Sequence, residues 1–128
     1  VCPWNKDAPE SFETGFKPRP EYVAAELTEL MKLDQSAFSK RFRKSPVKRT
    51  KRRGLLRNVA VALGNWAHAD AIPALSIGLH DIESVVRSHS AWALGRINNE
   101  RARNELKNAK IIEENPQVLR EIETALGK

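Results

Sequence analysis

The sequence predicts an all-α fold, a short right-handed solenoid of helix pairs that follows an irregular N-terminal segment. Two observations support this fold class. Residues 58–75 can be aligned on residues 89–106 at a spacing of 31, and a third, partial copy begins at residue 119. Repetition at this period is typical of stacked helices. In addition, no run alternates apolar and polar residues in the way that a half-buried strand does.

The composition fits one soluble domain. Of the 128 residues, 41% are hydrophobic and 30% are charged, and no apolar run approaches the roughly 18 residues that a membrane span needs. The single cysteine cannot form an internal disulfide and no secretory signal opens the chain, so we expect a cytoplasmic protein. We also expect it to be a monomer. Because the first residue is Val1 rather than a methionine, we expect the chain to be the C-terminal piece of a longer protein.

The segments before the repeats follow in order. Residues 1–20 contain four prolines and a glycine, which predicts an extended connector. Residues 21–54 are expected to hold a helix that starts at Pro20, a short second helix capped by Asp34, and a basic loop.

Residues 55–128 are expected to form the repeats. Each repeat is predicted as a long helix closed by Leu-Gly, a turn, and a second helix that ends near Leu79 or Leu106. The stretch VRSHSAWALGRI (86–97) resembles the HEAT-like repeats of the phycobilisome-lyase type. This resemblance implies a helical scaffold and specifies no chemistry.

Turn residues and aromatic residues within the repeats carry further expectations. The tryptophans of the repeat pattern, Trp66 and Trp92, are predicted to pack in the core. Glycines that follow a leucine are predicted left-handed C-caps, namely Gly64, Gly95 and Gly127. Polar residues before helices are predicted N-caps, namely Asp70, Ser84, and Asn115 before Pro116.

Positive charge is concentrated in one segment. Nine of the 22 Lys and Arg lie between Lys40 and Arg53 without an acidic residue among them, and the other 13 are outnumbered by the 16 acids. Such a block is often only a solvated surface, but it also binds nucleic acid by neutralising phosphates and releasing counterions. The N-terminus of the following helix adds a positive dipole end. The predicted phosphate-binding residues are Lys48, Arg49, Lys51, Arg52, Arg53 and Arg57, with Ser45 and Asn58 as polar helpers.

Catalytic and metal-binding patterns are scarce. The histidines, His68, His80 and His89, have no Glu or Cys at ligand spacing, so a structural or surface role is expected for them. Cys2 stands directly before a proline. In bacterial-type iron–sulfur runs, the fourth ligand is a cysteine followed by proline, and in two-cluster proteins it binds the other cluster. The sequence therefore marks Cys2 as a candidate cluster ligand and predicts no catalytic residue.

Four stretches, in order, resemble the C-terminal portion of the epoxyqueuosine reductases. They are VCPWNKDAP (1–9), LMKLDQSAFSKRF (30–42), SPVKRTKRRGLLRNVAVALGN (45–65) and the repeats that follow. The resemblance implies an oxidoreductase that reduces epoxyqueuosine to queuosine at the wobble position of tRNA. It also implies a catalytic domain that binds cobalamin and a ferredoxin-like module with two [4Fe-4S] clusters.

The resemblance assigns roles to parts of this chain. Residues 1–20 would be the tail of the ferredoxin-like module and a linker, and Cys2 would ligate a [4Fe-4S] cluster in the full-length enzyme. The basic segment would bind the anticodon stem-loop of tRNA. Because the catalytic domain and the other cluster cysteines are missing, we expect no complete cofactor in this chain and no catalysis by it alone.

Two alternative interpretations stay open. The chain could be a free-standing HEAT-repeat interaction module whose basic loop binds an acidic protein. It could also be a metalloprotein in which Cys2 and histidines bind a structural ion.

Overall fold

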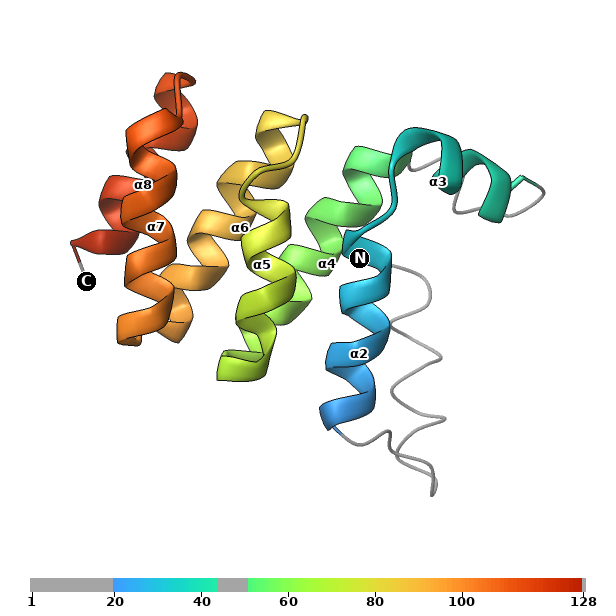
Figure 1. Ribbon diagram of the computed structural model, residues 1–128, viewed down its shortest axis with the longest axis horizontal. Helices are drawn as coiled ribbons and strands as arrows, with labels where there is room; N and C mark the ends of the chain where they lie inside the picture. Colours follow the sequence, from blue (N-terminus) through green and yellow to red (C-terminus); the bar gives the residue numbers. More distant parts are fainter. Residues whose placement is uncertain (1–19, 44–50, 128) are drawn as a thin grey trace.

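Seven α-helices and one 3₁₀ helix account for most of the residues that the structure describes, 20–43 and 51–127, and these residues form no strand. The structure is a computed structural model (Figure 1). It confirms the all-α repeat fold. The elements are α2 (Pro20–Met31), α3 (Gln35–Arg41), α4 (Lys51–Trp66), the 3₁₀ helix η2 (Ala69–Ala71), α5 (Ile72–Gly78), α6 (Ser84–Ile97), α7 (Glu100–Ile112) and α8 (Pro116–Leu126).

The helices form two layers. In Figure 1, α2, α5 and α7 lie side by side, and α4, α6 and α8 form a second layer behind them. Helix α6 packs against both α4 and α8, while α2 contacts α4 and α5. From α4 to α8, consecutive α-helices alternate between the two layers. This is the stacked-pair architecture that the 31-residue repeat predicts.

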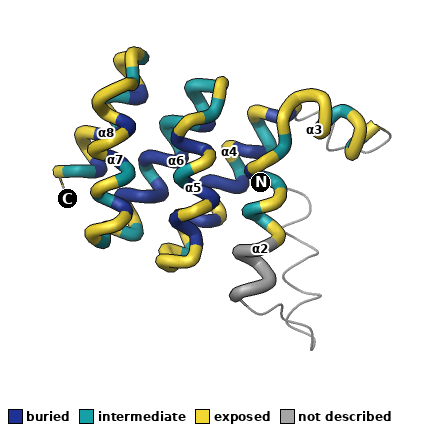
Figure 2. Tube along the Cα trace, in the orientation of Figure 1, coloured by how far each residue is buried: buried dark blue, intermediate teal, exposed yellow. Residues whose placement is uncertain are grey.

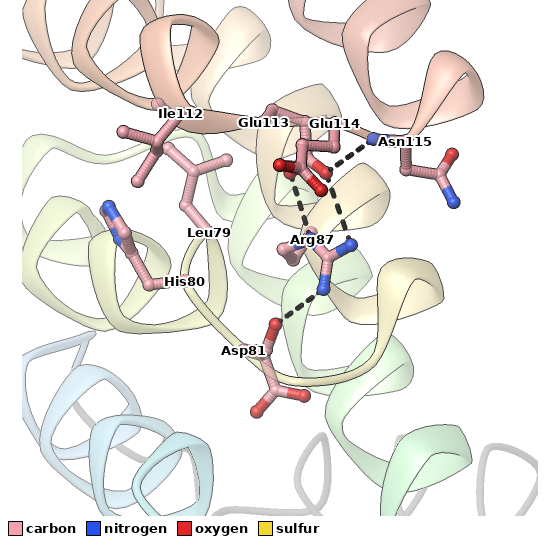
Figure 3. A pocket seen from close by; sticks show the side chains of 9 residues that line it. Leu79, His80, Asp81, Arg87, Ile112, Glu113, Glu114 and Asn115 are labelled. Carbon is pink, nitrogen blue, oxygen red and sulfur yellow. Dashed lines mark hydrogen bonds and ion pairs between the residues drawn. The ribbon is translucent and has the colours of Figure 1, made fainter.

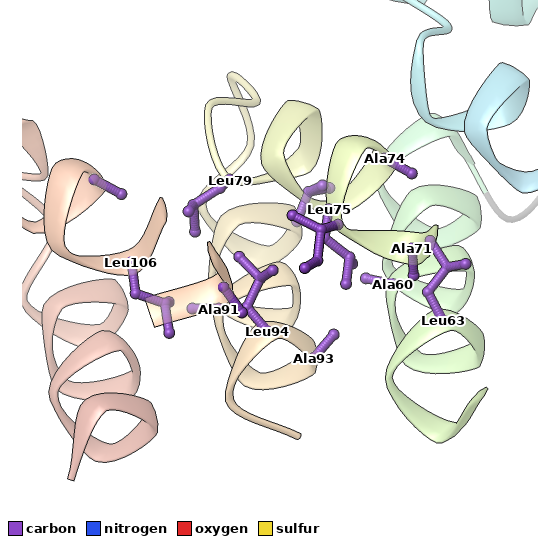
Figure 4. Close-up of a cluster of buried hydrophobic side chains, with 14 of the residues drawn as sticks. Ala60, Leu63, Ala71, Ala74, Leu75, Leu79, Ala91, Ala93, Leu94 and Leu106 are labelled. Carbon is purple, nitrogen blue, oxygen red and sulfur yellow. The ribbon is translucent and has the colours of Figure 1, made fainter. Parts of the chain in front are cut away.

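The core lies between the two layers (Figures 2 and 4). Residues that the repeat aligns occupy matching places: Leu63 and Leu94 are fully buried, and so are Leu75 and Leu106. Each fully buried leucine contributes about 1.5–3 kcal/mol through removal of apolar surface from water. Successive repeats therefore extend one continuous apolar core.

One aligned pair differs in burial. Ala93 is fully buried but its counterpart Ala62 is exposed. The physical reason is position in the stack. Ala93 of α6 packs against Gly64 of α4, the preceding helix of the same layer. Helix α4 is the first helix of that layer and has no such neighbour among the described residues.

The N-caps are partly as predicted. Asp34 Oδ1 accepts a hydrogen bond from Ala37 N at 2.7 Å, and Asn115 Oδ1 accepts from Val118 N at 3.2 Å, with a proline at the start of α8. These two predicted caps are confirmed. Asn99 caps α7 in the same way and was not predicted.

Two predicted caps are wrong. The chain enters η2 at Ala69, so Asp70 lies inside the first turn, and the acceptor there is His68 Nδ1, 3.0 Å from Asp70 N. Ser84 is the first residue of α6 rather than its cap, and no side chain caps this helix. In both turns the helix starts one or two residues earlier than the polar residue suggests.

Two of the three predicted glycine C-caps are wrong, and the third, Gly127, caps its helix but is not left-handed. Gly64 and Gly95 lie within α4 and α6, and Gly127 ends α8 with a right-handed φ of −76°. The residues that directly follow α4 and α6, Ala67 (φ 54°) and Asn98 (φ 49°), are the left-handed ones at these helix ends. Asn tolerates this conformation better than Ala does.

Gly64 and Gly95 instead allow neighbouring helices to approach closely. A Cβ on Gly64 would lie 2.5 Å from Trp92 Cζ3 and 3.0 Å from Ala93 Cα. A Cβ on Gly95 would lie 2.7 Å from Ala125 Cβ. Both glycines are therefore required by packing between α4, α6 and α8, and not by a turn.

Two predicted helix boundaries move. Helix α4 begins at Lys51, so the end of the basic segment is helical rather than a loop. Helix α7 continues to Ile112, well past the predicted end near Leu106, whereas α5 ends at Gly78, next to its predicted end.

A chain of polar contacts, here called the turn ladder, links successive inter-repeat turns. Arg52 donates from Nε to Leu33 O at 2.6 Å and from its two terminal nitrogens to the carboxylate of Asp81. Arg87 of α6 repeats, in the next helix pair, the arrangement that Arg52 has in α4. It donates to Asp81 O at 2.8 Å and forms an ion pair with Glu113 (Figure 3).

The acids of the turn ladder also accept from the backbone of their own turns. Asp81 Oδ2 accepts from Glu83 N at 2.9 Å, and Glu113 Oε2 accepts from Asn115 N at 3.1 Å. Each arginine thus takes a carbonyl from the turn before it and a carboxylate from the turn after it. The four side chains of the turn ladder are Arg52, Asp81, Arg87 and Glu113.

Replacement of Ser90 by alanine is expected to raise the free energy of unfolding by about 1 kcal/mol. The Ser90 hydroxyl is fully buried and has no hydrogen-bond partner among the described residues. An unsatisfied buried polar group costs about 1–3 kcal/mol, and alanine is also the better helix former. Urea denaturation followed by circular dichroism measures the change. A lower free energy of unfolding in the variant would show that the Ser90 hydroxyl does make a stabilising hydrogen bond.

Candidate nucleic-acid interface

The structure describes five of the eight predicted phosphate-contacting residues. Ser45, Lys48 and Arg49 lie outside the described residues, as does Cys2. The other five all lie in the first two turns of α4, at its N-terminal end. Those five are Lys51, Arg52, Arg53, Arg57 and Asn58.

Arg53 and Arg57 are exposed and lie one turn apart on the same side of α4. Both line a hollow of about 430 Å³ between the starts of α4 and α6, here called the helix-start hollow. Arg57 also contacts Asn58, with Nη2 3.1 Å from Oδ1. The hollow is therefore lined by two arginines one helical turn apart, and guanidinium groups are well suited to binding phosphate oxygens.

The opposite wall of the helix-start hollow is the N-terminus of α6. Ser84 and Val85 line it, together with Glu83. Because no side chain caps α6, its first N–H groups and the positive end of its dipole add to the charge of the arginines. Glu83 brings one negative charge to the rim.

Acidic residues are unevenly distributed among the helices. The sequences of α4 and α6 contain no Asp or Glu, whereas α2 contains three glutamates and no base. Arg96 and Arg120 add further exposed bases on α6 and α8. In α8 of the same layer there are two glutamates, and α7 of the other layer has four bases, so within the two layers only α4 and α6 combine bases with a lack of acids, which suits a polyanion.

Arg52, a predicted phosphate contact, binds other parts of the protein through its guanidinium. Its side chain is 9% exposed, and the turn ladder engages its guanidinium through Leu33 O and Asp81. A guanidinium with these partners is not free to bind phosphate. We therefore assign Arg52 a structural role, in which it fixes the N-terminal end of α4 against the turn before α6.

Sequence reasoning missed the far side of the hollow and the partner of Arg52. Ser84 and Val85 carry no charge, so no composition signal selects them. Asp81 is one acid among sixteen in the sequence and lies 29 residues from Arg52. The one sequence feature that could have pointed to the α6 side of the hollow is the absence of Asp and Glu from residues 84–97.

The histidines have structural contacts, as the sequence predicted. His68 caps η2 and stacks on Trp66 with ring centroids 4.7 Å apart. His80 Nδ1 lies 2.9 Å from Ser76 O. Within the described part of the chain, no three His, Cys, Asp or Glu residues gather in a way that could hold a metal ion.

None of the described helices has the length and apolar character needed to cross a membrane.

Residues 49–127 match the family model of HEAT repeats. The chain belongs to the HEAT-repeat family. The match includes α4 to α8, so the arginines of the helix-start hollow lie on the first helix of the HEAT-repeat region. The helical scaffold implied by the sequence is confirmed.

This HEAT-repeat chain is also similar to epoxyqueuosine reductases. The reductase of Xanthomonas campestris pv. campestris is 38% identical over 97 residues, which cover 75% of this chain and 27% of the relative. That of Listeria monocytogenes is 29% identical over 123 residues, which cover 95% and 32%. The resemblance inferred from the sequence is confirmed. The chain spans about a third or less of the length of these relatives.

Solved structures give the same result. An epoxyqueuosine reductase from Bacillus subtilis matches with a TM-score of 0.71 and 27% identity, over 79% of this chain and 27% of the other. A structure of epoxyqueuosine reductase with an epoxyqueuosine-modified tRNA-Tyr stem loop matches with the same score, identity and coverage.

Proposed function

We propose that this chain is the tRNA-binding C-terminal part of an epoxyqueuosine reductase, and that the full-length enzyme reduces epoxyqueuosine to queuosine in tRNA. The observation that carries the proposal is the similarity of 79% of the chain to an epoxyqueuosine reductase whose structure contains a tRNA stem loop. The acid-free, arginine-bearing face of α4 and α6 supplies the physical reason.

Binding would act mainly through the RNA backbone. Arg53 and Arg57 are exposed, carry no competing ion pair among the described residues, and flank the uncapped start of α6. Lys51, the first residue of α4, adds a further exposed base at the same helix end, and Asn58 adds an amide. Contacts of this kind position a folded RNA without reading its sequence. Ser45, Lys48 and Arg49 remain proposed contacts, and Arg52 is withdrawn from the set.

The redox groups implied by the family would lie outside this chain. One cysteine cannot complete a four-cysteine cluster, and no described residues form a metal-binding group. The residues present therefore do not fit a [4Fe-4S] cluster or identify a cobalamin site. Cys2 remains a proposed ligand that completes a cluster in the full-length enzyme.

The combined replacement of Lys51, Arg53 and Arg57 by alanine tests the RNA-binding role. We expect weaker binding of a tRNA anticodon stem-loop hairpin and a shallower dependence of log K on log salt. Each lost phosphate contact should reduce the slope by about 0.7–0.9. Fluorescence anisotropy between 50 and 300 mM KCl measures both quantities.

The matched control replaces three exposed bases of the other layer, Arg101, Lys107 and Lys110, which have the same total charge. This variant should keep most of the affinity. Equal loss in both variants would indicate a nonspecific charge effect. Unchanged binding in the α4 variant would remove the helix-start hollow from the interface, and preference of the chain for an acidic protein over the hairpin would favour the interaction-module interpretation.

A further inference from the structure

A second hollow, here called the tryptophan groove, continues the helix-start hollow. It lies between α4, α6 and α8 and has a volume of about 560 Å³, within the range of roughly 300–1,000 Å³ that is usual for small-molecule sites. Val61 lies one turn beyond Arg57 on α4, and His89 lies one turn beyond Val85 on α6. The two hollows therefore follow each other along the same pair of helices.

Trp92 supplies the aromatic ring of the tryptophan groove, and contacts with Gly64 and Arg96 fix its position. The ring lies against Gly64, where even a Cβ would come within 2.5 Å of Cζ3. The guanidinium of Arg96 lies over the ring at 5.6 Å from its centroid, and Arg96 Nε donates to Gly64 O at 3.2 Å. The indole is half-buried and lines the groove, whereas Arg96 does not line it.

His89 also lines the groove. Its Nδ1 lies 2.7 Å from Val85 O. A carbonyl oxygen only accepts, so in the neutral ring the proton is on Nδ1 and the lone pair is on Nε2. Nε2 has no partner among the described residues. A ribose hydroxyl or a base N–H can donate to it.

The third wall of the tryptophan groove comes from α8. Arg120 and Gln117 are exposed there, and Glu121 adds an acceptor. The groove thus joins an aromatic ring, a cation, an amide and two acceptors. Arg120 suits a phosphate, and the amide and acceptors suit the polar edge of a base.

We infer that the tryptophan groove binds one unpaired nucleotide of the RNA whose backbone lies on the helix-start hollow, with its base stacked on Trp92. The inference rests on the proposed function, because continuity with the basic face and the acid-free sequences of α4 and α6 are what favour RNA as the occupant. Stacking on an aromatic side chain accepts any base, so this subsite adds affinity and positions a loop nucleotide without selecting a sequence.

The test uses an anticodon stem-loop hairpin with 2-aminopurine placed at each loop position in turn. Quenching at one position is expected with the unaltered chain and is lost in Trp92→Leu, which should bind the hairpin about tenfold more weakly. Trp66→Leu is the matched control. Trp66 is also half-buried but lies outside the groove, so this variant should keep both the quenching and the affinity.

The outcomes separate this inference from the proposed function. If Trp92→Leu behaves like the unaltered chain while the Lys51, Arg53 and Arg57 variant loses binding, the subsite is wrong and the RNA-binding role stands. If the chain binds no hairpin, titration of its tryptophan fluorescence with guanosine monophosphate tests whether the groove binds a nucleotide. A response that Trp92→Leu abolishes retains the subsite, and no response overturns it. Circular dichroism verifies folding, and the exposed Arg120→Ala replaces Trp92→Leu if that variant is unfolded.

Discussion

Replacement of Asp81 by alanine is expected to lower the free energy of unfolding by about 3–5 kcal/mol, because it leaves a buried guanidinium without its anion. The side chains of Arg52 and Asp81 are 9% and 6% exposed. Asp81 also accepts from Glu83 N, so the same change removes a turn hydrogen bond. Urea denaturation followed by circular dichroism measures the loss.

An exposed ion pair provides the control for Asp81. Glu29 and Lys32 lie 3.7 Å apart with both side chains more than half exposed, so Glu29→Ala should cost well under about 1 kcal/mol. The double variant Arg52→Met, Asp81→Leu should be more stable than Asp81→Ala, because no charge is left buried. If Asp81→Ala is no more destabilising than Glu29→Ala, the buried pair is not a structural contact.

Replacement of both Gly64 and Gly95 by alanine is expected to lower the free energy of unfolding by roughly 1–3 kcal/mol. Alanine gains about 1 kcal/mol per site in helix propensity. The added Cβ atoms, however, would meet Ala93 Cα at 3.0 Å and Ala125 Cα at 3.1 Å, and overpacking against backbone costs about 1–3 kcal/mol per site. The two sites lie in different helix contacts, so their effects should add.

The exposed Asn65 next to Gly64 provides the control. Asn65→Ala also gains helix propensity but adds no buried atom, so it should raise stability by a few tenths of a kcal/mol. Thermal denaturation of the three proteins compares them under one condition. A double glycine variant that is as stable as Asn65→Ala would show that α4, α6 and α8 can separate without cost.

The sequence was sufficient for the features that depend on periodicity. The 31-residue repeat predicts the paired helices, and aligned leucines such as Leu63 and Leu94 are buried as a repeat requires. Local capping signals succeeded where a polar residue stands immediately before the first helical turn, as at Asp34 and Asn115. Of the described arginines in the basic segment, Arg41, Arg43 and Arg53 are exposed and Arg52 is buried.

The errors arise where a distant contact decides the role of a residue. Gly64 looks like a helix end in sequence, but contact with Trp92 from the next helix explains why glycine is required. Arg52 is one base in a basic run, and only the fold brings Asp81 to it. Trp92 was predicted to pack in the core. It does pack against the core, but it also lines a groove that requires α8 to complete it.

The turn ladder has a consequence for the way the molecule opens. Asp81 contacts Arg52 through its carboxylate and Arg87 through its carbonyl, so one turn joins two successive helix pairs. Opening of the α7–α8 pair would release Glu113 and leave Arg87, only 20% exposed, without its anion. Unfolding of helix pairs from the C-terminus therefore costs free energy at each turn, because each step separates a partly buried ion pair. In native-state hydrogen exchange, α6 and α8 should exchange as one cooperative unit, rather than in separate steps from the C-terminus.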